Sequence, residues 1–216
     1  MLTIHTAGLL VTGDRRPALA GGAILVDGRT CAAVGPYEEL AAAHPAARVR
    51  RWPGLIAPGL VNPYGPELLE QAYHPDPREA GELGTEPIAG EALVALALGD
   101  ARWGASARRG VQRMLAHGTV AVAGQLSRPA VVDAVQRAGL AQEGRFERPA
   151  GPPSLDPLAG RSLAEAMVRP LPSDAPHGQD ATFAVFGVPD EAALTARGAG
   201  NCVATVVAGR LVHRRR

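Results

Sequence analysis

The 216-residue chain carries 22 basic and 21 acidic residues, so its formal net charge is only +1. This balance gives no electrostatic reason to expect nucleic-acid binding. Hydrophobic residues make up 46% of the chain, which favours one or two folded domains with a real core over global disorder. No apolar run approaches the roughly 20 residues needed to span a membrane, so we expect no membrane association.

The expected compartment is the cytoplasm. The N-terminus lacks a basic region followed by an apolar core, so the sequence predicts no signal peptide. Cys31 and Cys202 lie far apart in the chain and belong to no CxxC spacing. They are therefore predicted to be free thiols in a reducing environment.

The first quarter of the chain is predicted to consist mainly of short strands. Asp27 and Gly28 form a strong two-residue hairpin signal, because both turn positions favour a positive φ. Pro36 is predicted to open a short helix over residues 37–43, which ends before His44 and the proline that follows it. Strands are predicted at residues 2–6, 9–12, 23–26, 31–34, 49–52 and 55–57.

The middle of the chain alternates strand and helix signals. A short strand is predicted at residues 60–62. Residues 63–87 hold Pro, Gly, Glu and Asp with little periodicity, so we expect a loop there. Apolar faces predict one helix around residues 92–97 and a second helix that is stopped by Gly118.

The second half of the chain changes character at residue 149. Before that point, Ser127 is predicted to cap a helix that ends at Gly139. Seven prolines fall within residues 149–178, which predicts a linker laid over the surface. Within it, the run from Ser162 to Glu165 is a capping-box pattern that predicts a short helix. Further strands are predicted at residues 119–123, 182–188, 203–208 and 210–212.

A short run at residues 58–69, PGLVNPYGPELL, resembles a motif of the amidohydrolase superfamily. The family motif reads Pro-Gly-Leu-(Val/Ile)-(Asn/Asp)-x-His-x-His-Leu. It forms the first strand of a (β/α)8 barrel, and its two histidines hold the catalytic metal. Here Tyr64 and Pro66 stand at the two histidine positions. A proline side chain offers no lone pair and a neutral phenol is a poor ligand for Zn²⁺ or Fe²⁺, so the resemblance implies an ancestry together with a loss of metal binding.

Both ends of the chain resemble a single domain of the same superfamily. The start, from LTIHTAGLLVTGD to LIAPGLVN, and the end, from QDATFAVFG to AGRLVHRRR, resemble the composite β-sandwich of imidazolonepropionases and aminodeoxyfutalosine deaminases. The run RRGVQRMLAHGTVAVAG resembles the first barrel helix and the second barrel strand. The resemblance implies an α+β fold: a composite β-sandwich from residues 1–60 and 180–216, about two βα units of a barrel at 61–148, and a Pro/Gly-rich linker at 149–179.

The stretch between the two ends is too short for a complete barrel. About 120 residues separate Asn62 from Ala181, whereas a (β/α)8 barrel takes roughly 250 residues and seldom fewer than 200. In the family, the later strands carry a carboxylated lysine or its substitute, two further histidines and an aspartate. The chain contains no lysine, and no segment matches the strands that would hold the other ligands. We therefore expect no catalytic residues, no metal ligands and no cofactor.

Four residues that follow the first barrel strand are candidates for a ligand site. Tyr64, Glu67 and Glu70 come directly after residues 60–62, on the face where barrel active sites form, and His74 begins a His-Pro-Asp run. In one interpretation they are remnants of a pocket that still binds a small ligand. In the other they are solvated loop residues, because no catalytic partners can be named and one His with one Asp is too few for a closed metal site.

The sequence favours a non-catalytic role. We expect an imidazolonepropionase-like pseudoenzyme that binds a small metabolite or supports a partner, either a second copy or an intact amidohydrolase homologue. Barrel strands without all their neighbours leave open edges, which proteins normally cover. The alternatives are a hydrolase acting on carbon–nitrogen bonds other than peptide bonds, as the family resemblance implies, and a purely structural subunit beside an intact homologue.

Overall fold

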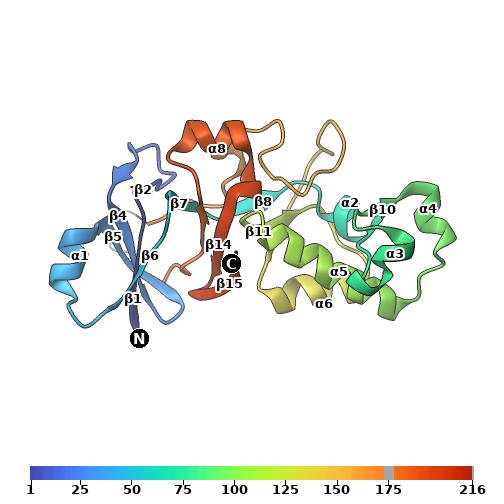
Figure 1. Cartoon of the computed structure of the whole chain (residues 1–216), viewed down its shortest axis with the longest axis horizontal. Helices are drawn as coiled ribbons and strands as arrows, with labels where there is room; N and C mark the ends of the chain where they lie inside the picture. The colour runs from blue at the N-terminus through green and yellow to red at the C-terminus, as the bar shows by residue number, and fades with distance from the viewer. Residues whose placement is uncertain (173–177, 216) are drawn as a thin grey trace.

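The computed structural model of the chain describes residues 1–172 and 178–215. Its elements are spread along one long axis, with helix α1 (Tyr37–Ala43) near one end and helices α5 (Asp100–Leu115) and α6 (Pro129–Ala138) toward the other (Figure 1). Several sheets and helices are present and no closed barrel occurs in the described ranges, which confirms the α+β class. No described helix combines the length and apolar character needed to cross a bilayer.

The first sheet is built entirely from the N-terminal part of the chain, in the order β5-β4-β1-β6. Its hairpin turns where the sequence predicts, since Asp27 pairs with Thr30 and Gly28 has φ +57°. Helix α1 follows directly, and its Leu40 packs against Ile4 and Leu25 of the sheet. The strands are β1 (Leu2–Thr6), β4 (Gly22–Asp27), β5 (Thr30–Pro36) and β6 (Arg48–Arg51).

The second sheet joins strands from the two ends of the chain, in the order β15-β14-β13-β7-β2-β3. At its centre, Leu55 pairs with Phe186 and Pro58 with Phe183, although these residues are far apart in sequence. Its strands are β2 (Leu9–Leu10), β3 (Leu19–Ala20), β7 (Leu55–Pro58), β13 (Phe183–Phe186), β14 (Cys202–Val207) and β15 (Arg210–Arg214).

A shared hydrophobic core lies between these two sheets. Val26 of the first sheet is buried in one cluster with Phe183 and Val206 of the second, and Val34 packs against that cluster, as the sequence predicts. The alternate residues of β13 face the other way: Phe186 lies in a second cluster with Leu194 of helix α8 (Glu191–Arg197). Both faces of β13 are therefore covered, which explains why its FAVF sequence is apolar throughout.

A third sheet contains the parallel strands β12-β11-β8, namely β8 (Leu60–Asn62), β11 (Thr119–Ala123) and β12 (Ala141–Glu143). Helices α5 and α6 cover it, and the buried side chains Val111, Met114 and Val131 belong to its core cluster. Strand β12 goes beyond the sequence prediction. Its Ala-Gln-Glu sequence contains no β-branched or aromatic residue, so the usual strand signal is missing.

The expectation of a loop over residues 63–87 is wrong. This segment folds into helix α2 (Gly65–Leu69), strand β9 (Ala72–Tyr73), the 3₁₀ turn η1 (Pro77–Glu79) and helix α3 (Ala80–Leu83). Strand β10 (Ile88–Ala89) then pairs with β9. The turn η1 has a physical cause that the sequence contains. The Asp76 carboxylate accepts from the Arg78 N–H and the Glu79 carboxylate from the Asp76 N–H, a reciprocal cap.

Two predictions about helices also need correction. Ser127 does not cap α6: the N-cap residue is Arg128, without a side-chain cap, and the Ser127 hydroxyl instead donates to Glu70. The helix predicted around residues 92–97 is α4 (Gly90–Ala95), but none of its residues is buried and Val94 is 79% exposed. The predicted end of α6 at Gly139 is confirmed, and this glycine is left-handed, with φ +80°.

The proline-rich segment lies along the first parallel strand. Residues 173–177 of this predicted linker lie outside the described part of the chain. Helix α7 (Leu163–Ala166) begins at the predicted capping box of Ser162 and Glu165. Beyond it, Met167 forms a bridge with Leu60, and the Val168 N–H donates to the Gly59 carbonyl. Met167 and Val168 thus make backbone contacts that a proline could not make as a donor. They cover part of the edge of the strand that begins at Leu60.

Strand β14 is preceded by a second 3₁₀ turn, η2 (Ala199–Asn201).

Cys31 of β5 and Cys202 of β14 are both buried and free, which confirms the prediction of unpaired thiols. Burial raises the pKa of the Cys31 thiol to about 11, and it raises that of Cys202 as well, so both stay protonated at neutral pH.

Candidate functional site

The candidate site lies at the C-terminal edge of the three parallel strands, the edge at which barrel enzymes place their active sites. Helix α2 closes this edge by direct backbone contact. A Cβ atom on Gly65 would come within 2.8 Å of the Ala123 carbonyl oxygen. Gly124, at φ +106°, has no room for a side chain either, because its Cβ would lie 2.7 Å from Cδ of Pro66. Glycine at both positions therefore lets α2 seal the ends of the strands.

The last residue of the first parallel strand, Asn62, ties the proline-rich segment to this edge. Its fully buried carboxamide donates to the carbonyls of Ser154 and Leu155 over 2.9 and 3.2 Å, and it accepts the N–H of Tyr64 over 2.9 Å. The Tyr64 hydroxyl donates to the Ala150 carbonyl over 2.8 Å. Tyr64, which stands at the first histidine position of the family motif, thus uses its hydroxyl for a hydrogen bond within the protein.

Glu67 is buried in an ion pair. The guanidinium of Arg145 donates to Oε2 over 2.8 Å and to Oε1 over 3.0 Å, and it also donates to the Pro63 carbonyl. Arg148 approaches Oε1 to 3.4 Å. Burial raises the pKa of Glu67, but the hydrogen bonds and positive charges of the arginines outweigh it, so its pKa lies below the ordinary value. The carboxylate is therefore charged at neutral pH and already paired.

The Glu70 carboxylate binds the two residues that precede helix α6. Its carboxylate accepts the N–H of Ser127, the N–H of Arg128 and the Ser127 hydroxyl, over 2.7, 2.6 and 3.0 Å. The Arg128 guanidinium lies 4.4 Å from the centroid of the Trp103 ring, within cation–π distance. These contacts order the loop between β11 and α6 and leave the carboxylate of Glu70 largely satisfied.

His74 is fully buried behind helix α5, where Gly110 leaves space for its ring. Its Nε2 lies 2.8 Å from the Leu68 carbonyl, which can only accept, so Nε2 carries the proton. Burial lowers the pKa of His74, and Nδ1 has no partner among the described residues. The backbone of His74 is fixed by the Ser106 hydroxyl and by the Arg109 guanidinium.

The four predicted candidates differ in burial and in whether they line a cavity. Tyr64, Glu67 and His74 are buried, so the interpretation as solvated loop residues is wrong for these three, whereas Glu70 is half-buried. Glu67 and Glu70 line one cavity of about 610 Å³ beside α2, whereas Tyr64 and His74 lie outside it. Further residues of this cavity, which the sequence prediction missed, are Leu93, Val94, Leu98, Trp103, Arg128, Arg148 and Pro153.

One missed residue had a usable signal. Arg145 lies two residues after the end of the short strand β12, at the same edge as the candidates that follow β8. The rule that functional side chains follow barrel strands would have selected it, had β12 been recognised. The residues from α4 carry no comparable signal, because their place beside α2 depends on the fold of residues 63–89.

The metal that the family resemblance implies does not fit these residues. Of the two family ligand positions, Tyr64 uses its hydroxyl for the Ala150 carbonyl, and Pro66 offers carbon atoms that pack against Gly124. Within residues 1–172 and 178–215, no three His, Cys, Asp or Glu side chains are grouped so that they could hold a metal ion.

Comparison with known families supports the composite-domain resemblance. Residues 22–47, which span β4, β5 and α1, match the family model of the imidazolonepropionase-like composite domain of bacteria. This match confirms the predicted resemblance in that segment. No curated protein matches the chain in sequence.

Several solved structures are similar to parts of the chain. A. niger ochratoxinase is 20% identical, with 66% of this chain and 30% of that chain covered and a TM-score of 0.46. A zinc-bound adenosine deaminase from Xanthomonas campestris is 18% identical over 65% of this chain and 32% of its own, with a TM-score of 0.47. E. coli guanine deaminase is 17% identical over 67% and 36%, also with a TM-score of 0.47. The chain spans about a third of the length of these proteins.

Proposed function

We propose that this chain is an amidohydrolase-related protein that has lost hydrolysis and keeps a binding role. In this proposal, residues 1–60 and 180–216 are the composite β-sandwich, residues 61–148 are the remnant of the barrel, and residues 149–179 are a Pro/Gly-rich linker. The proposal is supported by the matched segment at residues 22–47 and by the motif at residues 58–69.

The main observation in support of a loss of hydrolysis is the ion pair between Glu67 and Arg145. A barrel hydrolase needs open space and free polar groups at the ends of its strands. Here the buried carboxylate of Glu67 and the guanidinium of Arg145 satisfy each other, and α2 lies against the strand ends. A substrate would have to displace this pair, which costs several kcal/mol when a buried charge loses its partner.

The binding role is proposed for the cavity beside α2. Its lining includes the apolar side chains of Leu93, Val94 and Leu98 and the carboxylates of Glu67 and Glu70. Because both carboxylates already have internal partners, a small metabolite bound there would gain most of its affinity from apolar contact. Trp103 lines the same cavity, so binding should change its fluorescence in titrations with small metabolites, and the change should disappear in Trp103→Phe.

A partner-supporting role is the other half of the proposal. Strand β12 pairs with β11 on one side only within the described residues, and its three side chains are not buried. An edge of this kind can pair with another chain. Sedimentation at micromolar concentration tests for a homodimer, and purification from the native host tests for an intact amidohydrolase homologue. A monomer in the first and no such homologue in the second contradict this half of the proposal.

The alternative function is a hydrolase acting on carbon–nitrogen bonds other than peptide bonds. It is supported by the family match alone, and the lining of the strand ends argues against it. The two functions differ in two measurements on the purified full chain. The proposal expects no stoichiometric transition metal and no turnover of deaminase or imidazolone substrates. The alternative expects a bound metal and turnover that chelators abolish.

A further inference from the structure

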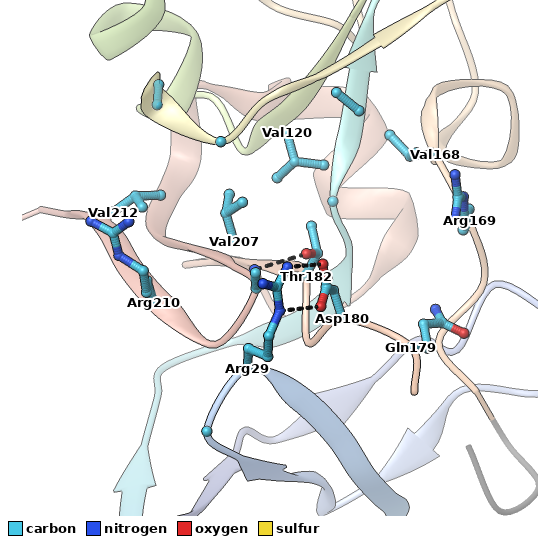
Figure 2. Close-up of a pocket in the computed structure, with 16 residues that line it drawn as sticks. Arg29, Val120, Val168, Arg169, Gln179, Asp180, Thr182, Val207, Arg210 and Val212 are labelled. Atoms are coloured by element: carbon cyan, nitrogen blue, oxygen red, sulfur yellow. Dashed lines mark hydrogen bonds and ion pairs between the residues drawn. The ribbon is translucent and has the colours of Figure 1, made fainter. Parts of the chain in front are cut away.

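A second cavity lies at the opposite, N-terminal edge of the parallel sheet. Its volume is about 540 Å³, within the range of small-molecule sites. Gly59, Val120 and Ala141, at the starts of the three parallel strands, line one side of it. The turn at Arg29 and the strands that follow Asp180 line the other side (Figure 2). It shares no lining residue with the cavity beside α2.

The floor of this cavity is held in place by contacts between distant segments. Arg29 donates to both oxygens of Asp180, each over 2.9 Å, and the Ala181 N–H donates to the Arg29 carbonyl over 2.8 Å. The Thr182 hydroxyl oxygen accepts the N–H of Ala208 over 3.0 Å. These bonds join the β4–β5 turn, the start of β13 and the β14–β15 turn. A ligand would therefore meet a largely ordered surface, which reduces the entropy lost on binding.

The charges around this cavity are unbalanced toward positive. Three arginines line it, Arg29, Arg169 and Arg210, against one carboxylate, Asp180. The hydrogen bonds from Arg29 hold the pKa of Asp180 below its ordinary value, so this pair remains formed and neutral overall at pH 7. The guanidinium groups of Arg169 and Arg210 form no ion pair or hydrogen bond with any residue that the structure describes. Two guanidinium groups are thus left to attract an anion.

Between the two arginines lie both apolar side chains and the Arg29–Asp180 ion pair (Figure 2). Figure 2 shows Val120 and Val207 between Arg210 on one side and Arg169 on the other. The side chains of Val168 and Val212 add to this lining. Val120 and Val207 are only 3% and 7% exposed, so they form the fixed back of the cavity, and the half-buried Val168 and Val212 expose more apolar surface to a ligand. The lining therefore combines an apolar surface, the neutral pair of Arg29 with Asp180, and two further arginines.

We propose that this cavity binds a small organic carboxylate. The apolar body of the ligand would lie against the valines, and its carboxylate would be bound by Arg169 or Arg210, because a planar guanidinium matches a carboxylate with two parallel hydrogen bonds. Inorganic phosphate would satisfy the arginines but leave the valine surface without contact. The inference goes beyond the proposed function and does not depend on it, because the cavity lies away from the candidate site.

Isothermal titration calorimetry on the full chain tests this inference with three carboxylates of different bodies: benzoate, hexanoate and 3-phenylpropionate. The matched controls are the three corresponding amides, benzamide, hexanamide and 3-phenylpropanamide, which keep the body and lose the charge, and inorganic phosphate, which keeps a negative charge and loses the body. We expect at least one carboxylate to bind, and its amide to bind about tenfold more weakly or worse, since a hydrogen bond to a charged group contributes that much. Raising the salt concentration should also weaken the binding.

Variants locate the site. Arg169→Gln and Arg210→Gln are exposed changes that should leave the fold intact, and the double variant should lose carboxylate binding by about tenfold or more. Arg137→Gln, on α6 and outside the cavity, should bind as the parent does. Equal binding of acid and amide, phosphate binding as tight as that of the carboxylates, an unaffected double variant, or no binding of any of the three carboxylates at millimolar concentration would each overturn the inference.

Discussion

The guanidinium of Arg145 donates to both carboxylate oxygens of Glu67, over 2.8 and 3.0 Å. This ion pair joins the ends of two parallel strands that are not neighbours in the sheet. Glu67 lies in the helix after β8, and Arg145 follows β12. Only 3% of the Glu67 side chain and 18% of the Arg145 side chain is exposed. An internal ion pair thus occupies the position at which a barrel enzyme would bind its substrate.

The first prediction concerns this pair. Glu67→Gln should lower the free energy of unfolding by about 3 kcal/mol, because it leaves the mostly buried charge of Arg145 without its partner. Urea denaturation followed by circular dichroism measures the change. The matched control is Asp133→Asn, which breaks the exposed pair with Arg137 and should cost less than about 0.5 kcal/mol. Equal effects of the two substitutions would contradict the structural role assigned to Glu67.

The second prediction concerns the attachment of the proline-rich segment. Asn62→Ala removes two donors to the carbonyls of Ser154 and Leu155, and it should cost about 2 kcal/mol because these buried groups lose their partners. Hydrogen exchange of residues 150–158 should become faster than in the parent protein. Gln136→Ala, an exposed change on α6, is the control and should leave this exchange unchanged. Unaltered protection of the segment in Asn62→Ala would refute the proposed attachment.

The third prediction compares two glycines of one helix. A Cβ on Gly110 would lie 2.7 Å from Nε2 of His74 and 2.8 Å from a methyl group of Leu69, so Gly110→Ala should cost about 1–3 kcal/mol. A Cβ on Gly104 would meet Ala130 at an ordinary 3.4 Å. Gly104→Ala should therefore stabilise the protein by up to about 1 kcal/mol through helix propensity. Thermal denaturation of both variants decides, and a harmless Gly110→Ala would show that the His74 packing is wrong.

The fourth prediction is a loss of stability in mild acid. Burial, with a smaller contribution from Arg50, lowers the pKa of His5 to about 4, and its Nδ1 accepts the indole N–H of Trp52 over 3.1 Å. The unfolded chain binds a proton near pH 6.5 and the folded chain does not. Stability from neutral His5 is thus complete above about pH 6.5 and falls as the pH drops toward 4, by up to about 3 kcal/mol.

Two variants test this assignment to His5. His5→Asn keeps an acceptor for Trp52 but cannot be protonated, so its free energy of unfolding should fall less between pH 6.5 and 4.5 than that of the parent. His44→Asn, at the end of α1, should retain the full dependence. Because burial also lowers the pKa values of His74 and His213, a residual dependence is expected in His5→Asn. A dependence identical to that of the parent would exclude His5 as a source.

The sequence predicted the fold best where local signals and burial agree. The Asp27-Gly28 turn, the capping box at Ser162 and the left-handed glycine at Gly139 each act within a few residues, and each is found in the structure. Predictions failed for residues 63–87, whose short elements are fixed by contacts with α5 and with the strand ends. No periodic pattern can develop in elements of two to five residues, so the usual signals were absent.

The candidate site was predictable in position but not in its interactions. The family-like motif placed Glu67 and Glu70 directly after residues 60–62, and in the structure they follow strand β8. Their partners, Arg145 and the backbone of Ser127 and Arg128, come from loops about 60 to 80 residues further along the chain. Such pairs depend on the register of the parallel strands, which a single sequence does not specify. Burial of a glutamate is also unusual, which is why a solvated loop was the natural alternative.

The metal content of the purified full chain tests the central claim most directly. After extensive dialysis, elemental analysis for zinc, iron, manganese and nickel should give far less than one metal ion per chain, because Tyr64 and Pro66 cannot replace histidine ligands and Glu67 is held by Arg145. One tightly bound transition metal per chain, removable only with chelators, would contradict the account and favour the carbon–nitrogen hydrolase.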